Sequence, residues 1–419
     1  MSASEIEPAA SGLGALVSAV YQPVMELEHG GIVGYEALAR GPQGGQLERP
    51  DRLLSAARRA GLLAQVDWEM RLAAVAGALD ARLDRCTTLF VNMEPEAVGP
   101  SANGDGRAPD LWSRAEQSLS VAVELPAGAL RARPRELVRA ADACRDRGWA
   151  VVLDDVGADR HSLAVLPLVA PDAIKLDLRA TRGSGAAAPT LSDIATAVWS
   201  EQERTGAAII AEGIETEQQL EQARGIGATL GQGWLWGRPG PLPSEAMLPI
   251  EGGPLWQELR PPASRDTPFE LLAATRPLRE APAARMATMS GHIERATHDV
   301  GAGAIVLTSL DDAAGFDGAA RDRYRDLASR TTLVAVFGSG ISATPAIGVF
   351  GTDVATDDPL HREWAVIALA PHYAAALVAR ASEQQPDDVL PRERRYDYVL
   401  THDRDLVVAA ARSLAARLG

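Results

Sequence analysis

Short apolar runs with the length and composition of β-strands alternate with charged, amphipathic stretches up to about residue 240. The runs are “SAVYQPVMEL”, “GIVGYEAL”, “TLFVNME”, “VAVEL”, “AVVLDDV”, “AIKLD”, “GAAIIAEG” and “GATLGQGWLW”. The stretches between them, such as “RPRELVRAADACRDRG” and “TEQQLEQARGIG”, carry apolar residues at the three-to-four spacing of a helix. This alternation predicts a parallel sheet covered by helices, and eight strands predict a (β/α)8 TIM-like barrel.

The first two runs are joined only by “EHGG”, which is too short for a helical crossover. We therefore expect an antiparallel hairpin at the start of the barrel. Residues 238–267 are dense in proline and glycine and indicate a domain boundary. The predicted organisation is a flexible N-terminus over 1–12, the barrel over 13–245, a linker over 246–268 and a second domain over 269–419.

The second domain also has an α/β pattern. It begins with a stretch at 268–301 that looks mostly helical, bent or divided at Pro277 or Pro282. The strand-like runs that follow are “AIVLTSL”, “TTLVAVFG”, “AIGVFGT”, “WAVIALAP” and “DYVLTH”, and “DRDLVVAAARSLAARL” predicts a terminal helix. We expect a smaller α/β domain here.

Composition narrows the class of protein. The net charge of −15 argues against a general DNA or RNA binder, which needs a basic surface. Cys86 and Cys144 have neither disulfide-framework nor zinc spacing, which is typical of a reducing compartment. The first basic residue is Arg40, and no uncharged apolar run reaches 18 residues. We expect a cytoplasmic protein without a signal peptide or membrane partner.

Polar side chains end nearly every predicted strand of the barrel. Parallel barrels gather catalytic residues at this end, because all these strand ends open on one face. The residues concerned are Glu36, Asn92, Glu124, Asp154, Asp155, Asp177, Glu212, Glu215 and Gln232, with Arg40 just after the second strand. Taken singly, each could cap a helix or face solvent. Together they crowd carboxylates at one mouth, which raises their pKa values unless a cation is bound.

Lys175, on the sixth predicted strand, is the only lysine among 41 basic residues. A chain that uses arginine everywhere else keeps a compact amine here, whose pKa can fall near metals and which can orient or deprotonate water. The surrounding oxygen donors, without cysteine or histidine, favour Mg²⁺ or Mn²⁺ over Zn²⁺. Two divalent cations are the usual arrangement for hydrolysing a phosphate ester.

The string “YQPVMELEHGGIVGYEALARGP” resembles the opening of the EAL domain family of cyclic di-GMP phosphodiesterases. From residue 15 to about 245 the chain follows that family's motif order, with “FVNMEP”, “VELP”, “LDDVG”, “IKLD”, “AEGIET” and “GQGWLWGRP”. The resemblance implies a (β/α)8 barrel with an antiparallel first strand. It also implies hydrolysis of one phosphodiester bond of cyclic di-GMP to linear pGpG.

The resemblance assigns roles residue by residue. Two divalent metals would be held by Glu36, Asn92, Glu124, Asp154 and Asp155. Lys175 would lie beside the attacking water, with Glu212 supporting it and Gln232 touching the same water shell. The substrate-binding residues would be Gln22, Arg40, Glu215 and Asp177, with a charge-assisted bond from Arg40 to a phosphate.

The chain departs from the family pattern at Ala127 and in the loop that follows the aspartate pair. Active members have a second glutamate where this chain has Ala127, and that glutamate anchors the loop that follows the aspartate pair. The loop is usually “DDFGxGxSSL” but reads “DDVGADRHSL” here, with Val156 and Asp159 as replacements. Either turnover is weakened, or Asp159, Arg160 or His161 builds a different contact. The alternative function is a cyclic di-GMP receptor with little activity, which passes the signal to a partner.

The C-terminal part, from about 270 to 410, resembles the DICT domain, a sensory module. The similarity rests on “GAIVLTSL”, “LVAVFGSG”, “DPLHREWAVIALAPHYAAALVAR” and “YDYVLTHDRDLV”. It implies an unidentified signal or partner that biases the barrel. The family often forms homodimers through loops near the fifth and sixth strands, so a homodimer is possible. The inserted segment “RATRGSGAAAPT” could alter that contact.

Overall fold

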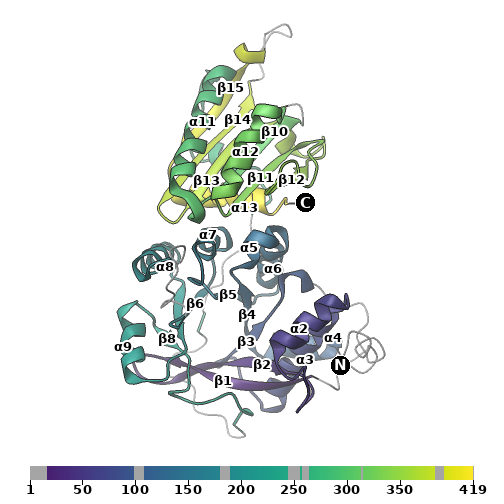
Figure 1. The fold of residues 1–419 in the computed structure, drawn as a ribbon, viewed down its shortest axis with the longest axis vertical. Coiled ribbons are helices and arrows are strands. Elements are labelled where there is room, and N and C mark those ends of the chain that lie inside the picture. The colour runs from purple at the N-terminus through teal and green to yellow at the C-terminus, as the bar shows by residue number, and fades with distance from the viewer. Residues whose placement is uncertain are drawn as a thin grey trace.

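The computed structural model describes residues 17–98, 108–179, 189–243, 255–256, 264–312, 315–382 and 391–418. They form a closed barrel and a separate C-terminal sheet domain that lies against the helices on one side of it (Figure 1). The predicted flexible segment 1–12 lies outside the described residues, as does most of the predicted linker.

The barrel contains eight strands, and its order follows the chain. They are β1 (Ser18–Glu26), β2 (Ile32–Arg40), β3 (Thr88–Asn92), β4 (Ser120–Pro126), β5 (Ala150–Asp154), β6 (Ala173–Asp177), β7 (Ala208–Glu212) and β8 (Leu230–Gly231). Strand β1 is antiparallel to β2 and β8, whereas β2 to β8 pair in parallel. The predicted barrel and its antiparallel first hairpin are therefore confirmed. The hairpin register places Gln22 opposite Glu36.

Helices surround these strands. They are α2 (Pro50–Arg59), α3 (Leu63–Asp80), α4 (Ala108–Ser118), α5 (Ala129–Ala132), α6 (Pro134–Asp146), α7 (Arg160–Val169), α8 (Leu191–Thr205) and α9 (Glu217–Gly225), and a 3-10 turn, η3, spans Pro95–Ala97. Local sequence sets several starts. Helices α8 and α9 begin at reciprocal capping boxes, Thr190 with Asp193 and Thr216 with Gln219.

The eighth strand is much shorter than the predicted run “GATLGQGWLW”. After Gly231 the chain bonds to the segment that follows β7, because Ile214 N donates to Gln232 O and Leu235 N donates to Ile214 O. A Cβ atom on Gly233 would lie 1.9 Å from Ile214 O, so only glycine permits this approach. The chain therefore leaves the barrel just where Gln232 faces the mouth.

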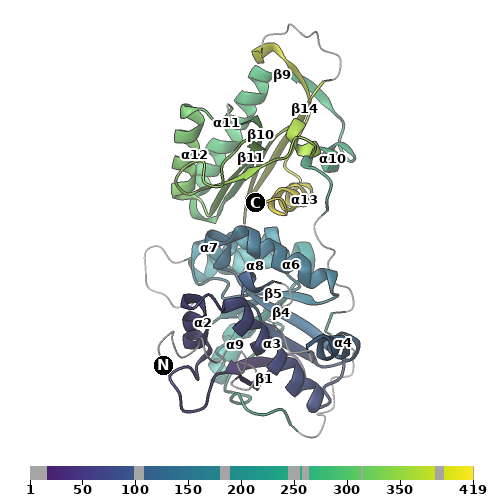
Figure 2. The ribbon, with the colours of Figure 1, turned by 90° about the vertical axis from the view of Figure 1, so that its right-hand side faces the viewer.

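The C-terminal domain is a seven-stranded sheet between two layers of helices. In spatial order the strands are β12 (Val349–Asp353), β11 (Leu333–Ser339), β10 (Ile305–Asp312), β13 (Glu363–Ala370), β14 (Tyr373–Ala381), β15 (Arg395–Thr401) and β9 (Arg279–Pro282). Helices α11 (Ala283–Val300) and α12 (Gly318–Arg330) cover one face, and α10 (Pro268–Ala273) and α13 (Arg404–Ala415) lie on the other (Figure 2). Short 3-10 turns lie at η5 (Gly301–Gly303), η7 (Pro359–Arg362) and η8 (Pro391–Glu393).

Two features of this domain differ from the sequence prediction. The stretch expected to be mostly helical contains an edge strand, β9, between α10 and α11, and Pro282 ends it at the N-cap of α11. Strand β14, “YAAALVARA”, was not predicted. Its alanines have low intrinsic strand preference, and its place between β13 and β15 makes it a strand.

The two domains are joined by a continuous layer of side chains. Helix α13 packs between the sheet and α6 and α7 of the barrel. Arg204 in α8 pairs with Asp405 in α13 at 3.3 Å, and Arg412 in α13 lies 3.6 Å from Asp142 in α6. Buried apolar side chains extend from the barrel to the sheet as one cluster. None of the described helices is long and apolar enough to span a membrane.

Candidate active site

Carboxylates from four strands converge on the ammonium of Lys175 in β6. Its Nζ atom lies 2.6 Å from Glu212 Oε1, 2.9 Å from Glu124 Oε1 and 3.2 Å from Glu36 Oε2. Asp154 Oδ1 lies 4.0 Å away. The structure therefore places the Lys175 ammonium at the centre of four of the predicted carboxylates.

The charge state of Lys175 follows from these neighbours. Burial alone would lower the pKa of its ammonium, because a charged group loses hydration. Asp154, Glu124, Glu212 and Glu36 outweigh this effect and raise the pKa of Lys175 well above its ordinary value. With these carboxylates around it, the Lys175 ammonium is placed to donate hydrogen bonds to Glu36 and Glu212.

Glu36 is the most fully hydrogen-bonded member of the cluster. It accepts from Asn92 Nδ2 at 3.0 Å, from Gln232 Nε2 at 2.8 Å and from Lys175 Nζ at 3.2 Å. Burial opposes its ionisation, but Lys175 and the two amides lower the pKa of Glu36 below its ordinary value. Glu36 is thus a fixed carboxylate on the wall of the mouth.

Glu124 has the opposite environment. Its side chain is 1% exposed, and neither of its oxygens accepts a hydrogen bond from the described residues. Lys175 is within ion-pair distance of Oε1 but is not aligned for a hydrogen bond. Burial and the charges of Glu36, Asp154 and Glu212 raise the pKa of Glu124 well above its usual value. A buried carboxylate without donors is poorly satisfied unless a cation binds it.

Two further acidic residues of the site, Glu212 and Asp155, have raised pKa values. Burial raises the pKa of Glu212 to about 8, against the attraction of Lys175. Asp155 follows β5 at φ +57°, a left-handed conformation that aspartate tolerates at sharp turns. Burial and the charge of Asp154 raise the pKa of Asp155.

The predicted substrate-binding residues lie around the mouth and are less closely associated with Lys175 than the four carboxylates are. Gln22 in β1 donates to Gly237 O at 3.1 Å and lies 3.5 Å from Gln232 Nε2. Arg40 ends β2 and donates to the carbonyl of Ala39. Asp177 ends β6 and binds Arg179, and Glu215 is exposed on the loop after β7. None of these four is among the residues that contact Lys175.

A buried ion pair that sequence reasoning missed fixes the loop after Asn92. Asp67 and Arg71, one turn apart in α3, pair at 2.8 Å. Asp67 accepts from Glu94 N, and Arg71 donates to Ala97 O. The signal was an Asp–Arg pair at i, i+4 within an otherwise apolar helix.

The family of this barrel follows from comparison with known proteins. The model of the EAL domain matches residues 14–239, more than half of the chain. The chain belongs to the EAL domain family. Its EAL letters are residues 36–38, within β2. A second model, DICT, the sensory domain in diguanylate cyclases and two-component system, matches residues 270–382. Both predicted family resemblances are therefore confirmed.

Two curated relatives match about half of this chain. The cyclic di-GMP phosphodiesterases NbdA and RocR of Pseudomonas aeruginosa are 28% and 27% identical to it over 225 and 226 residues. These matches cover 53% of this chain, but 29% of NbdA and 57% of RocR. The Klebsiella pneumoniae BlrP1 complex with calcium and cyclic di-GMP shares 25% identity over 54% of this chain and 57% of that chain, with a TM-score of 0.45.

Loop 156–162 departs from the family pattern and is held by contacts of its own. Asp159 caps α7 by accepting from Ser162 N at 2.8 Å, and Ser162 Oγ accepts from Gly157 N at 2.8 Å. Arg160 reaches Asp193 in α8 at 3.4 Å. His161 Nδ1 lies 3.1 Å from Thr332 Oγ1 in the DICT domain. The replaced residues thus attach the loop to α7, to α8 and to the second domain.

Ala127 takes no part in these anchors through its side chain. It is buried with 1% exposure, and its backbone N donates to Asp154 O. Val156 is also buried, and its backbone N donates to Lys175 O. The apolar replacements therefore pack under the loop, and backbone hydrogen bonds hold the aspartate pair in place.

Proposed function

We propose that this barrel hydrolyses one phosphodiester bond of cyclic di-GMP to linear pGpG. The observation that carries the proposal is the Lys175 ammonium, held among Glu36, Glu124, Glu212 and Asp154 at the mouth of an EAL barrel. A receptor has little use for a buried amine in a carboxylate ring. The relatives named as cyclic di-GMP phosphodiesterases support the same substrate.

The acidic residues fit two divalent cations, Mg²⁺ or Mn²⁺. The donors are all oxygens, and both oxygens of buried Glu124 are free to accept. The residues that would hold the ions are Glu36, Asn92, Glu124, Asp154 and Asp155. When bound, the cations would lower the pKa of water and neutralise charge on the phosphate.

The chain's own residues position the reactants. Lys175 donates to the attacking water from one side, and Glu212 holds the ammonium in place at 2.6 Å. Gln232 connects the wall carboxylate Glu36 to Gln22 on β1. The guanidinium of Arg40 turns from its backbone contact to a phosphate oxygen of the substrate. Asp177 and Glu215 lie at the outer rim, next to the nucleotide bases.

A second function has a specific observation in its favour. Ala127 and the loop 156–162 lack the family's usual support for the aspartate pair, and misplaced catalytic groups can lose about 100-fold in rate. The same loop touches the DICT domain through His161. The alternative is therefore a cyclic di-GMP receptor of low activity that passes the signal through this contact.

One experiment separates the two functions. The full chain is incubated with cyclic di-GMP and Mg²⁺ or Mn²⁺, and the products are resolved by chromatography, while binding is measured separately. We expect pGpG from the wild type and a loss of about 100-fold or more in kcat for Lys175→Arg, with binding retained. Arg139→Lys, on the exposed face of α6, serves as the matched control and should not change the rate.

Each function has an outcome that contradicts it. Binding without any pGpG, at any concentration of either metal, would favour the receptor over the enzyme. Hydrolysis by Lys175→Arg at the wild-type rate would contradict the role given to the amine.

We further propose that the DICT domain regulates the barrel through α7. This helix begins at the loop after Asp154 and Asp155, and it packs against η5 and β13 of the DICT domain. A shift of the DICT domain would thus move the loop that carries two predicted metal ligands. The surface after β6, where the family homodimer contact was expected, includes residues 180–188, which lie outside the described residues, and the homodimer stays a prediction.

A further inference from the structure

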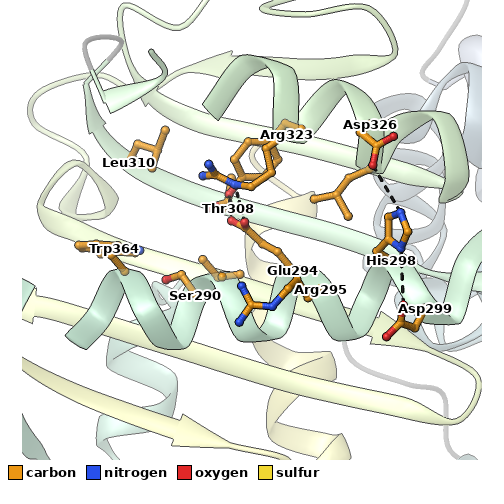
Figure 3. A pocket seen from close by; sticks show the side chains of 15 residues that line it. Ser290, Glu294, Arg295, His298, Asp299, Thr308, Leu310, Arg323, Asp326 and Trp364 are labelled. Carbon is orange, nitrogen blue, oxygen red and sulfur yellow. Dashed lines mark hydrogen bonds and ion pairs between the residues drawn. The ribbon is translucent and has the colours of Figure 1, made fainter. Parts of the chain in front are cut away.

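A trough of about 670 Å³ lies in the DICT domain, between α11 and α12 and over strands β10 and β13 (Figure 3). Helix α11 leads into β10, and α12 leads out of it. At this position the strand pairing changes from parallel to antiparallel, since β10 is parallel to β11 and antiparallel to β13. The trough lies between the two helices at this change, and clefts of this kind commonly bind ligands.

Small residues on α11 keep one end of the trough open. Ala287, Ser290 and Gly291 share a helical face with Arg295, one turn further on. A Cβ atom on Gly291 would meet only Arg295 Nη1, at the ordinary distance of 3.4 Å. No close packing requires glycine there, although glycine weakens a helix interior. Its effect is to leave space beside Ser290.

Ser290 carries an unsatisfied hydroxyl into this space. The residue is 6% exposed, and its Oγ atom has no hydrogen-bond partner among the described residues. Buried polar groups are nearly always satisfied by protein, water or ligand. This hydroxyl lines the trough, so a bound ligand can supply its missing partner.

Arg295 offers a charge at the same end. It has no ion pair with any carboxylate in the described part of the chain, whereas the other charges of the trough are engaged. Glu294 accepts from Arg323 Nε at 2.6 Å and from Tyr324 OH at 2.7 Å. His298 lies between Asp299 and Asp326 at 3.6 and 3.4 Å.

Apolar side chains complete this end of the trough. Trp364, Leu310 and Val366 contribute a flat indole and two aliphatic surfaces. Figure 3 places Trp364 and Leu310 at the end near Ser290, away from the acidic His298 end.

We propose that the trough binds a small aromatic monocarboxylate. The ring lies against Trp364, and the carboxylate accepts hydrogen bonds from Arg295 and from Ser290 Oγ. Asp299 and Asp326 at the far end disfavour a second anionic group, which excludes nucleotides and other multiply charged phosphates. The proposal does not depend on phosphodiester hydrolysis, and its test measures binding alone.

The test uses 2-naphthoate, benzoate and indole-3-acetate as probes, with the full chain and isothermal titration calorimetry. We expect saturable binding of one molecule per chain and no comparable binding of the uncharged analogue 2-naphthamide. Arg295→Gln should weaken binding about tenfold or more, and Ser290→Ala about fivefold. Gly291→Leu should abolish it by filling the space. Arg325→Gln, on α12 outside the trough, is the matched control and should bind like the wild type.

Three outcomes would overturn the proposal. The first is no saturable binding of any of the three acids to the wild type. The second is binding of 2-naphthamide as tight as that of 2-naphthoate, and the third is unchanged affinity in Arg295→Gln. Because Arg295 is exposed, its variant should fold normally, and circular dichroism of each variant separates lost binding from lost structure.

Discussion

The Lys175 side chain is 2% exposed, and the four carboxylates around it raise its pKa well above the ordinary value. The sequence identified this centre, since the only lysine falls on a strand that ends at the barrel mouth. It did not predict the partners of each side chain. Contacts of 3 to 4 Å depend on how several strands end together, and Gln232 meets Glu36 only because the barrel closes. Glu215, predicted to bind substrate, lies exposed on the loop after β7.

The excess of carboxylates around Lys175 predicts that Glu124→Gln stabilises the fold in the absence of metal. Four carboxylates share one ammonium, and Glu124 has no hydrogen-bond donor in the described structure. Without metal, the amide should stabilise the fold by about 1 kcal/mol, because it removes a buried like charge and leaves Lys175 with three partners. The measurement is thermal unfolding in the presence of a chelator. The Glu124→Gln variant should also lose two properties. Added Mn²⁺ should no longer stabilise it, and it should no longer hydrolyse cyclic di-GMP.

Glu203→Gln provides the matched control, because Glu203 is exposed on α8. It should leave the melting temperature and its response to Mn²⁺ unchanged. A lower melting temperature for chelated Glu124→Gln would show that the carboxylate stabilises the fold by itself.

At the scale of elements, sequence pattern identified most strands of both domains and failed where neighbours decide the structure. Strand β14 is rich in alanine and becomes a strand because β13 and β15 bond to it on either side. Strand β8 stops after two residues because Gly233 lets the chain pack against Ile214. Neither effect is visible in local periodicity. In the loop after β5, the sequence predicted a different contact from Asp159, Arg160 or His161, and Asp159 caps α7.

The cap on α7 predicts the effect of changing Asp159. Asp159→Ala removes the acceptor for Ser162 N and should lower the free energy of unfolding by about 1 kcal/mol. Hydrogen exchange at the amide of Ser162 should become faster, because its bond is lost. Asp159→Asn keeps an acceptor oxygen and should change both quantities little. Unchanged protection of Ser162 in Asp159→Ala would show that the other anchors alone fix the loop.

At the scale of the whole molecule, the contact between the domains combines ion pairs with a histidine, His161. The ion pairs Arg204–Asp405 and Arg412–Asp142 cross the boundary at 3.3 and 3.6 Å. His161 faces Thr332 across the boundary, with Arg131 and Asp159 beside it on the barrel side. Sequence patterns within either domain could not predict this contact, because its two sides are 171 residues apart. The domain docking therefore has a component that responds to acid.

The direction of that response follows from the environment of His161. Burial, and then the positive charge of Arg131, lower the pKa of His161 below its ordinary 6.5. Asp159 and the backbone of Ala302 act in the opposite direction, and Arg131 belongs to the barrel in either state, so it is the burial against Thr332 that makes the docked state favour the neutral ring. Its contribution to docking is fully present above pH 6.5 and is lost as the pH falls below that value, because the undocked ring takes up a proton first.

We expect the radius of gyration of the full chain, measured by small-angle X-ray scattering, to increase between about pH 7.5 and about pH 5.5 as the domains separate. His161→Gln keeps a polar group opposite Thr332 but cannot be protonated in this range, so its radius of gyration should change less. The fixed ion pairs at the boundary are present in both proteins, so they cancel in the comparison. An equal expansion of the two proteins would assign the acid response to another group and remove His161 from the coupling between the DICT domain and the loop that carries Asp154 and Asp155.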